Sequence, residues 1–235
     1  QHLLPLLDWA RPAQGARAYL TGSNYIWGWE MTRLARERIT AAGGEVVGER
    51  YLPLGSTEVG RIVEEIRATR PAFILNNLVG PSSYEFLAQM QRLAAADPDF
   101  APARCPILSC NLTEAELPAI GAAAEGLVSA GPYFRGTAGG GFGSSPEAAA
   151  HAAVMELARL LNGRPGAEAA SLPDLLEGAP GPGMIDRTTH HTALPVVIAR
   201  VEGGAFRPVK ALPARPGDPY LTRERMPLAA PQLLV

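Results

Sequence analysis

The amino-acid sequence predicts an α/β protein with a doubly wound parallel sheet, helices on both faces of that sheet, and a hairpin near the C-terminal end. Over the first two-thirds of the chain, short apolar runs alternate with longer runs whose apolar residues recur at helical spacing. Strands and helices that alternate in this way form βαβ units, which build parallel sheets covered on both sides. The composition agrees, because 47% of the 235 residues are hydrophobic and the 25 glycines and 22 prolines supply turns.

The predicted strands and helices follow one another closely. Strands are expected at Ala18–Leu20, Glu45–Leu52, Phe73–Leu78, Ile107–Cys110 and Leu127–Tyr133. Helices are expected at Gly28–Ala42 and Thr57–Thr69, and two more at the capping boxes Ser82 with Glu85 and Thr113 with Glu116. The helix at Thr57–Thr69 is the clearest, because its apolar residues follow the i, i+3, i+4, i+7 pattern.

The pattern changes after residue 135. Gly136–Gly143 is rich in glycine, and Ser145-Pro146-Glu147 is a strong helix start, for a helix that should stop near Gly163. Gly178–Gly183 is a turn-rich joint. Pro195–Val201 and Phe206–Ala211 predict a hairpin around Gly203-Gly204, and the Pro-rich end is expected to be extended.

Charge and composition exclude several function classes. The net charge is −2 and there is no long basic run, so no nucleic-acid or membrane partner is expected. No apolar run reaches the roughly 18 residues of a membrane-spanning helix. Cys105 and Cys110 have neither redox nor zinc spacing, and as the ends of one strand they would lie about 17 Å apart, too far for a disulfide. His190 and His191 should point to opposite sides of an extended segment, so no metal site is predicted.

The most informative residues follow the strands, because parallel sheets bind ligands at the carboxyl ends of their strands. After the first strand come Ser23, Asn24, Tyr25 and Trp27, followed by Trp29. Their rings and amides suit a small, neutral, planar ligand such as an amide. An alternative reading stays open, in which these rings fill space beneath the start of the next helix.

Two further loops are candidate binding sites. Asn76–Ser83 places amides and hydroxyls before a helix N-terminus, where they either face a ligand or cap the helix locally. Gly139–Ser144 has neither Walker nor dinucleotide-loop spacing, which favours a flexible connection. There is no nucleophile-elbow motif, and acids and histidines do not cluster after any strand, so the sequence does not indicate an enzyme.

The segment Gly22–Ile26 resembles the type I periplasmic-binding-protein family, within which the chain looks most similar to urea-binding proteins of ABC transporters and amide-sensing regulators of amidase operons. The other stretches that carry the resemblance lie along most of the chain. They are Ala41–Gly55, Leu108–Glu116, Pro132–Phe134, Ile185-Asp186, His190-His191, Ile198–Val201 and Asp218-Pro219-Tyr220.

This resemblance implies two βαβ lobes that close on a ligand. Residues 1–134 correspond to the second, ligand-binding lobe, 135–183 to a connection and a helix returning to the first lobe, and 184–235 to strands and a tail that complete the lobe. Tyr25 is implied as a direct ligand contact with Trp27 beside it, and Val79, Gly80 and Tyr133 lie in other cleft-facing loops. The opening part of the first lobe is expected to be absent before Gln1, which leaves half a cleft.

The predicted function is therefore the binding of a small neutral amide or urea, without a cofactor, metal or catalytic residue. The resemblance implies either a periplasmic receptor with an ABC-transporter permease as partner, or a cytoplasmic amide sensor with an antitermination regulator. Two alternatives remain: an α/β enzyme with a phosphate-bearing cofactor at the glycine-rich loop, or a truncated lobe that binds nothing. A half-cleft would expose Tyr25, Trp27 and Trp29, so self-association into homo-oligomers is also expected.

Overall fold

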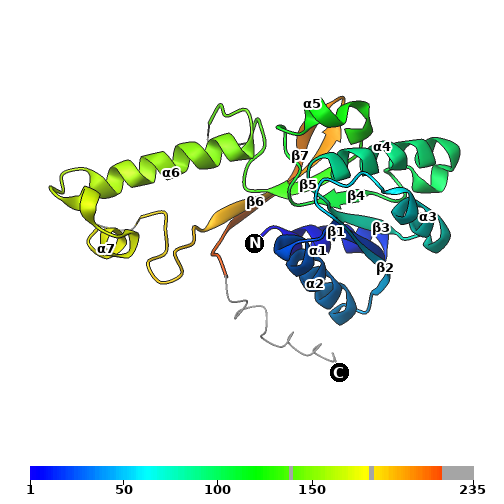
Figure 1. The fold of residues 1–235 in the computed structure, drawn as a ribbon, viewed down its shortest axis with the longest axis horizontal. Helices are drawn as coiled ribbons and strands as arrows, with labels where there is room; N and C mark the ends of the chain where they lie inside the picture. Colours follow the sequence, from blue (N-terminus) through cyan, green and yellow to red (C-terminus); the bar gives the residue numbers. More distant parts are fainter. Residues whose placement is uncertain (138–139, 180–182, 219–235) are drawn as a thin grey trace, which may run out of the picture. The chain divides into compact units, whose positions relative to one another are not determined.

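The computed structural model describes residues 1–137, 140–179 and 183–218, and its centre is a seven-stranded sheet (Figure 1). The strand order is β2-β1-β3-β4-β5-β6-β7. The strands are β1 (Arg17–Ser23), β2 (Glu45–Leu52), β3 (Phe73–Asn77), β4 (Ile107–Ser109), β5 (Val128–Gly131), β6 (Leu194–Glu202) and β7 (Ala205–Arg215). The first five strands pair in parallel, and β6 pairs antiparallel to β5. The predicted hairpin is confirmed, and its strands extend the parallel sheet.

Helices connect the strands. They are α1 (Leu3–Gln14), α2 (Ile26–Ala41), α3 (Gly60–Thr69), α4 (Pro81–Ala96), α5 (Leu117–Ile120), α6 (Ser145–Leu161) and α7 (Leu172–Glu177), with short 3-10 turns η1 (Pro98–Phe100), η2 (Gly121–Ala124) and η3 (Ala167–Ala169). Side chains of a strand alternate between the two faces of a sheet. Accordingly Leu20 and Leu75 pack with α1 and α2 on one face, whereas Tyr19 and Ile74 pack with α3 and α4 on the other. The predicted doubly wound architecture is confirmed.

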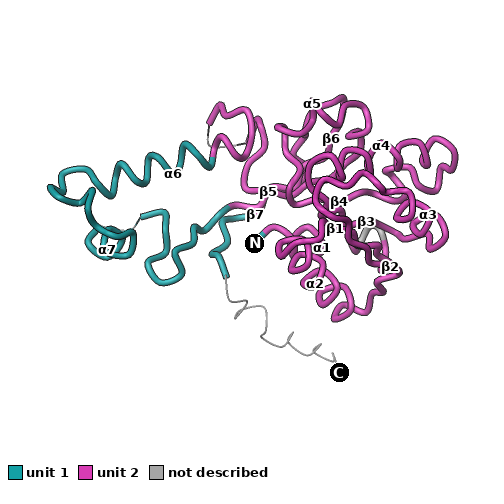
Figure 2. Tube along the Cα trace, viewed as in Figure 1, with its two compact units in different colours: residues 1, 149–194, 213–235 teal, residues 2–148, 195–212 magenta. Residues whose placement is uncertain are grey.

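The chain divides into two compact units (Figure 2). The larger unit contains residues 2–148 and 195–212, and therefore the parallel sheet. The smaller unit contains residues 1, 149–194 and 213–235, of which 180–182 and 219–235 lie outside the described residues. It has its own apolar cluster, formed by Leu160, Ala167, Leu175, Leu176 and Ala179.

Helix α1 was not predicted, although its signal is present in the sequence. Leu3, Leu6, Leu7 and Ala10 are all buried and follow the helical i, i+3, i+4, i+7 pattern. Pro5 hides this pattern, because proline usually breaks helices. It lies here in the first helical turn, where the backbone N–H groups have no partner within the helix in any case.

Of the two predicted capping boxes, one is wrong. Helix α4 begins at Pro81 and not at a Ser82 cap, and Glu85 instead accepts hydrogen bonds from Gln89 and Arg92, both at 3.0 Å. The reciprocal bond of the other box forms, because the backbone N–H of Thr113 donates to Glu116 at 2.6 Å. Helix α5 nevertheless begins only at Leu117.

The prediction of an extended segment at His190-His191 is wrong. Asp186 accepts bonds from the backbone N–H groups of Thr188 (3.0 Å) and Thr189 (2.7 Å), and His190 has a φ of 55°. These bonds form a tight turn. Pro219 and Tyr220, part of the resemblance, lie outside the described residues.

Cys105 and Cys110 are both free thiols. Among the described residues, no cluster of three or more His, Cys, Asp or Glu side chains is arranged to hold a metal ion. Within that same part of the chain, no helix combines the length and hydropathy that crossing a membrane requires.

Candidate functional site

The loops that follow four neighbouring parallel strands meet at one edge of the sheet in the larger unit. We call this edge the carboxyl rim, and it consists of Ser23–Trp27 after β1, Leu78–Gly80 after β3, Cys110–Thr113 after β4 and Pro132–Phe134 after β5. Because β1, β3, β4 and β5 are adjacent and parallel, the predicted placement of Tyr25, Gly80 and Tyr133 on one edge is confirmed.

A close backbone approach shapes the first rim loop. A Cβ atom placed on Gly28, in the first turn of α2, would come within 2.1 Å of the carbonyl oxygen of Ser23. Only glycine therefore allows α2 to start directly against the end of β1. This sharp start leaves the Tyr25 and Trp27 rings together, with centroids 6.2 Å apart, on the surface of the loop.

The aromatic residues of this loop are partly exposed. Tyr25 and Trp27 are half-buried and Trp29 is exposed, whereas side chains that merely filled space beneath the helix would be buried. The indole Nε1 of Trp29 donates to Oδ1 of Asn24 at 2.9 Å, which fixes the orientation of that amide. The loop thus presents two rings and one oriented amide at the rim.

Hydrogen bonds link the rim loops after β1, β3 and β4 to a neighbouring strand or loop. They run from Asn24 N to Leu52 O (2.7 Å), from Val79 N to Ser23 Oγ (3.1 Å), from Asn111 Nδ2 to Leu78 O (3.0 Å) and from Ser129 Oγ to Leu112 O (2.6 Å). A site whose backbone is fixed in advance loses less entropy on binding. The rim is therefore preorganised across β2, β1, β3, β4 and β5.

Two adjacent asparagines end β3 and face opposite sides of the sheet. Asn76 donates to Ser83 Oγ at 2.9 Å and accepts from the backbone N–H of Leu78 at 3.1 Å. Asn77 is fully buried beneath the start of α2, and among the described residues neither its Oδ1 nor its Nδ2 has a partner. The sequence places both residues in one polar loop. Their surroundings differ because successive side chains of a strand point to opposite faces of the sheet.

Two of the predicted ligand contacts turn their hydroxyl groups toward the protein. Ser23 is fully buried and its Oγ accepts the Val79 bond. Tyr133 is 6% exposed, and its hydroxyl lies 2.8 Å from the carbonyl oxygen of Phe142 and 3.0 Å from that of Gly140. Both residues support the rim from within, and the accessible members of the predicted set are Asn24, Tyr25, Trp27, Val79 and Gly80.

The described part of the glycine-rich loop is bound by its own neighbours. The backbone N–H of Gly143 donates to the Glu147 carboxylate at 2.7 Å, and its carbonyl oxygen accepts from Arg135 at 3.2 Å. A phosphate loop directs free N–H groups at an anion. Here a carboxylate already occupies that position at the start of α6, which disfavours a phosphate-bearing cofactor.

Cys110 lies at the rim and is a free thiol. Burial raises the pKa of Cys110 to about 12, so its thiol is protonated at neutral pH.

Comparisons with known proteins agree with this fold. A family model described as a periplasmic binding protein domain matches residues 1–140. A solute-binding protein of an ABC transporter from Rhodopseudomonas palustris HaA2, in complex with p-hydroxybenzoic acid, superposes with a TM-score of 0.74 at 21% identity, over 92% of this chain and 65% of that one. An ABC transporter substrate-binding protein from Sphaerobacter thermophilus gives a TM-score of 0.71 at 22% identity, over 89% and 64% of the two chains.

A third solved structure, the amino acid ABC transporter substrate-binding protein from Pseudomonas fluorescens Pf-5, gives a TM-score of 0.67 at 17% identity, over 94% of this chain and 64% of that one. The chain therefore spans about 65% of the length of these structures. At such identities the superpositions establish the fold, which is that of type I periplasmic binding proteins, while the family match covers more than half of the chain. On these grounds, this chain belongs to the periplasmic binding protein family.

Proposed function

We propose that the chain is part of a solute-binding receptor for an ABC transporter, and that the carboxyl rim forms one side of its ligand site. The observation that carries this proposal is the preorganised rim, where Asn24, Tyr25 and Trp27 are accessible beside Val79 and Gly80. Membership of a family of binding proteins supports a receptor over an enzyme. The internal bonds of Gly143 also argue against the phosphate-dependent alternative.

The ligand that we favour is a small neutral amide or urea. None of the rim residues is a lysine, arginine, aspartate or glutamate, and the nearest charges in sequence, Glu114 and Arg135, directly follow two of the rim loops. Aromatic faces and a fixed amide hold a flat, uncharged molecule through stacking and hydrogen bonds. The likeness of Gly22–Ile26 to urea- and amide-binding proteins points the same way.

An aromatic carboxylate is the second candidate, and two observations favour it. Three solute-binding proteins from Rhodopseudomonas palustris with this fold hold p-hydroxybenzoic acid, benzoate or 3,4-dihydroxybenzoic acid. In this chain α2 and α4 both begin at the rim, and helix N-termini favour a negative charge without a cationic side chain.

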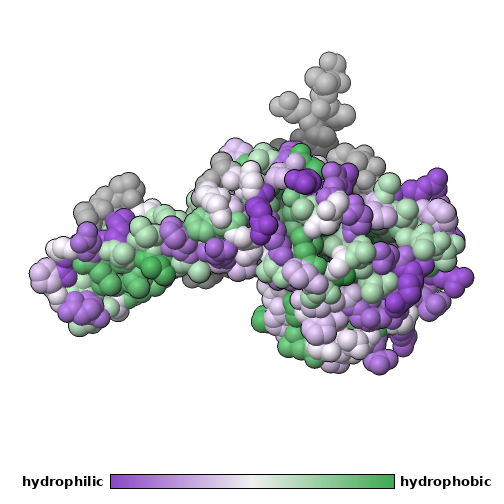
Figure 3. All heavy atoms as spheres, turned by 90° about the horizontal axis from the view of Figure 1, so that it is seen from above, coloured by the Kyte–Doolittle hydropathy of each residue, from purple (hydrophilic) through white to green (hydrophobic). Residues whose placement is uncertain are grey.

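The exposed apolar surface of α6 supports the proposal that this chain is part of a larger receptor. Of residues 149–161 only Glu156 and Leu160 are buried, while Val154, Met155 and Leu157 are exposed. Figure 3 shows apolar surface on the smaller unit, at the left of the view. A helix that is apolar on most sides is normally covered. We therefore place this chain in a two-lobed periplasmic receptor that delivers its solute to a permease, with an amide-sensing regulator as the alternative.

Tryptophan fluorescence tests the ligand assignment. Urea, acetamide, benzoate and p-hydroxybenzoate are titrated separately into the 235-residue chain, into Trp27→Phe and into the matched control Trp9→Phe, which changes α1 and not the rim. We expect acetamide or urea to change the emission of the wild type and of Trp9→Phe, and to change that of Trp27→Phe less, because only Trp29 then reports from the rim loop. A response to the benzoates alone selects the second candidate. A response that persists when Trp27 and Trp29 are both replaced by phenylalanine contradicts the rim as the site.

A further inference from the structure

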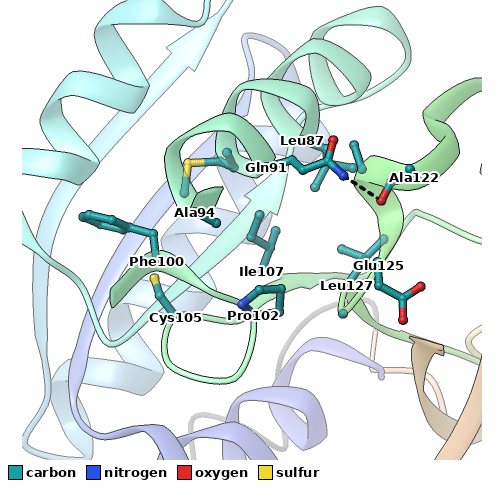
Figure 4. Close-up of a pocket in the computed structure, with 13 residues that line it drawn as sticks. Leu87, Gln91, Ala94, Phe100, Pro102, Cys105, Ile107, Ala122, Glu125 and Leu127 are labelled. Carbon is teal, nitrogen blue, oxygen red and sulfur yellow. Dashed lines mark hydrogen bonds between the residues drawn. The ribbon is translucent and has the colours of Figure 1, made fainter. Parts of the chain in front are cut away.

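A cavity of about 210 Å³ lies at the edge of the sheet opposite to the carboxyl rim (Figure 4). Leu87 and Met90 of α4, Phe100 of η1, and Ile107 and Leu127 at the amino ends of β4 and β5 form its walls. All of these residues belong to the larger unit. The cavity is therefore separated from the rim by the length of the strands.

The interior of this cavity offers little to an ion. Of its 13 lining residues only Gln91 and Glu125 have an amide or a charged head group. Gln91 donates to the carbonyl oxygen of Ala122 at 3.1 Å, and Glu125 accepts from the N–H groups of Gly203 (3.2 Å) and Gly204 (3.4 Å). Burial raises the pKa of Cys105 to about 12, so the thiol in the wall is neutral.

Two contacts fix the spacing of the walls of this cavity. The Gln91–Ala122 bond joins α4 to η2 across the cavity, as the dashed line in Figure 4 shows. At Gly126, where φ is 79°, an added Cβ would lie 2.3 Å from the Cβ of Pro102. Gly126 and Pro102 are therefore in close contact at this wall. The contact limits how far the pocket can close.

We propose that this cavity is a second binding site, for a compact, uncharged, apolar molecule of the size of one aromatic ring with a short substituent. An enclosed apolar cavity of about 150 Å³ takes up benzene, and about 210 Å³ leaves room here for a ring and a small group, in a pocket that is partly open to solvent because Gln91, Pro102 and Glu125 of its lining are exposed. A carboxylate is disfavoured, because the lining offers it no cationic side chain and Glu125 adds like-charge repulsion. The site is independent of the solute at the rim.

The test is an NMR titration of the 235-residue chain with toluene. We expect chemical-shift changes in the amides of the cavity walls, and nuclear Overhauser contacts between toluene and the methyl groups of Leu87, Met90 and Leu127. Ala94→Leu fills part of the cavity and should weaken toluene binding at least tenfold. The matched control is Ala95→Leu, on the same helix but exposed and outside the lining, and it should bind as the wild type does.

Benzoate is the charged counterpart of toluene and should leave the cavity resonances unchanged. Absence of Overhauser contacts between toluene and the cavity methyls in the wild type would overturn the proposal, whatever the folding of the variants. Equal toluene affinity in Ala94→Leu and Ala95→Leu would overturn it as well.

Discussion

Asn76 and Asn77 are adjacent in β3, yet their surroundings differ completely. The Asn76 amide has two protein partners, whereas both polar atoms of the buried Asn77 amide have none among the described residues. A buried hydrogen-bonding group without a partner costs about 1–3 kcal/mol. Asn77 is therefore expected to lower the stability of the fold at a position directly beneath the first rim loop.

Replacing each asparagine by leucine, which has a similar shape, separates these two roles. Asn76→Leu leaves Ser83 Oγ and the Leu78 N–H without their partner, so it should destabilise the chain by about 1–3 kcal/mol. Asn77→Leu removes two unpartnered atoms and should leave stability unchanged or raised. Guanidinium chloride unfolding measures both. An equal loss in the two variants would show that Asn77 is hydrogen-bonded in solution.

His2 makes stability depend on pH. Burial lowers the pKa of His2 from 6.5 to about 4, and its Nε2 is buried without a partner among the described residues. The unfolded state then binds a proton more readily than the folded state. The contribution of neutral His2 to the free energy of unfolding is therefore fully present above pH 6.5 and is lost as the pH falls toward 4. The loss is about 2–3 kcal/mol.

Thermal unfolding of the wild type and His2→Leu between pH 7 and pH 4 checks this expectation. The wild type should lose more stability than the variant over this range, because leucine does not titrate. If the stability of the two proteins changes equally with pH, His2 is not a buried neutral histidine.

The sequence predicted which residues lie on the rim but not where each side chain points. Tyr25 and Trp27 are accessible, as expected for rim residues after a strand. Ser23 and Tyr133 come from the same loops, but their partners lie at Val79 and at Gly140 and Phe142 in other segments. Local pattern does not encode such contacts, because they depend on how the loops meet in the folded chain.

At the scale of elements, the junction between β1 and α2 depends on a single glycine. A Cβ on Gly28 would meet the Ser23 carbonyl at 2.1 Å, whereas one on Gly60, at the start of α3, meets nothing within 4 Å. Gly28→Ala should therefore force α2 away from β1 and destabilise the chain by about 1–3 kcal/mol. Gly60→Ala, the matched control, should be neutral or slightly stabilising.

Both glycine variants are compared by thermal unfolding and by the near-ultraviolet circular dichroism of the aromatic residues. Gly28→Ala should also alter the aromatic signal, because it moves the Tyr25–Trp27 pair. Equal melting temperatures for Gly28→Ala and Gly60→Ala would mean that the close approach is absent in solution.

The order of strands and helices was largely predictable, and their boundaries were less so. The sequence predicted both ends of β2 correctly, because clear turn signals stand on either side of this strand. The β5 strand is shorter than predicted, since Pro132 and Tyr133 leave the sheet toward the glycine-rich loop. The pairing of β6 with β5 joins residues about 70 positions apart, which no local periodicity reveals.

At the scale of the whole molecule, two exposed apolar surfaces are candidates for the contact through which copies of the chain associate. The rim loop exposes Ile26 and Trp29, and α6 exposes Val154, Met155 and Leu157. Large exposed apolar patches usually bind partners. Because α6 contributes more such residues in a continuous helix, we expect the 235-residue chain to self-associate mainly through α6.

Sedimentation velocity distinguishes these two surfaces. The double variant Met155→Lys with Leu157→Lys should be more monomeric than the wild type at equal concentration. Ile26→Lys with Trp29→Lys, the matched change at the rim, should have the smaller effect. If the change at the rim has the larger effect, the chain self-associates through the rim, as the sequence predicted.

The central claim is that the carboxyl rim binds a small solute, and amide-resolved NMR tests it most directly because it detects weak, millimolar binding. Acetamide, urea, benzoate and ATP are titrated separately into the 235-residue chain. We expect acetamide or urea to cause shifts that concentrate on Ser23–Trp27 and Val79-Gly80, and ATP to cause no shifts at Gly140–Gly143. Shifts at the glycine-rich loop with ATP, together with an unchanged rim for every solute, would contradict it.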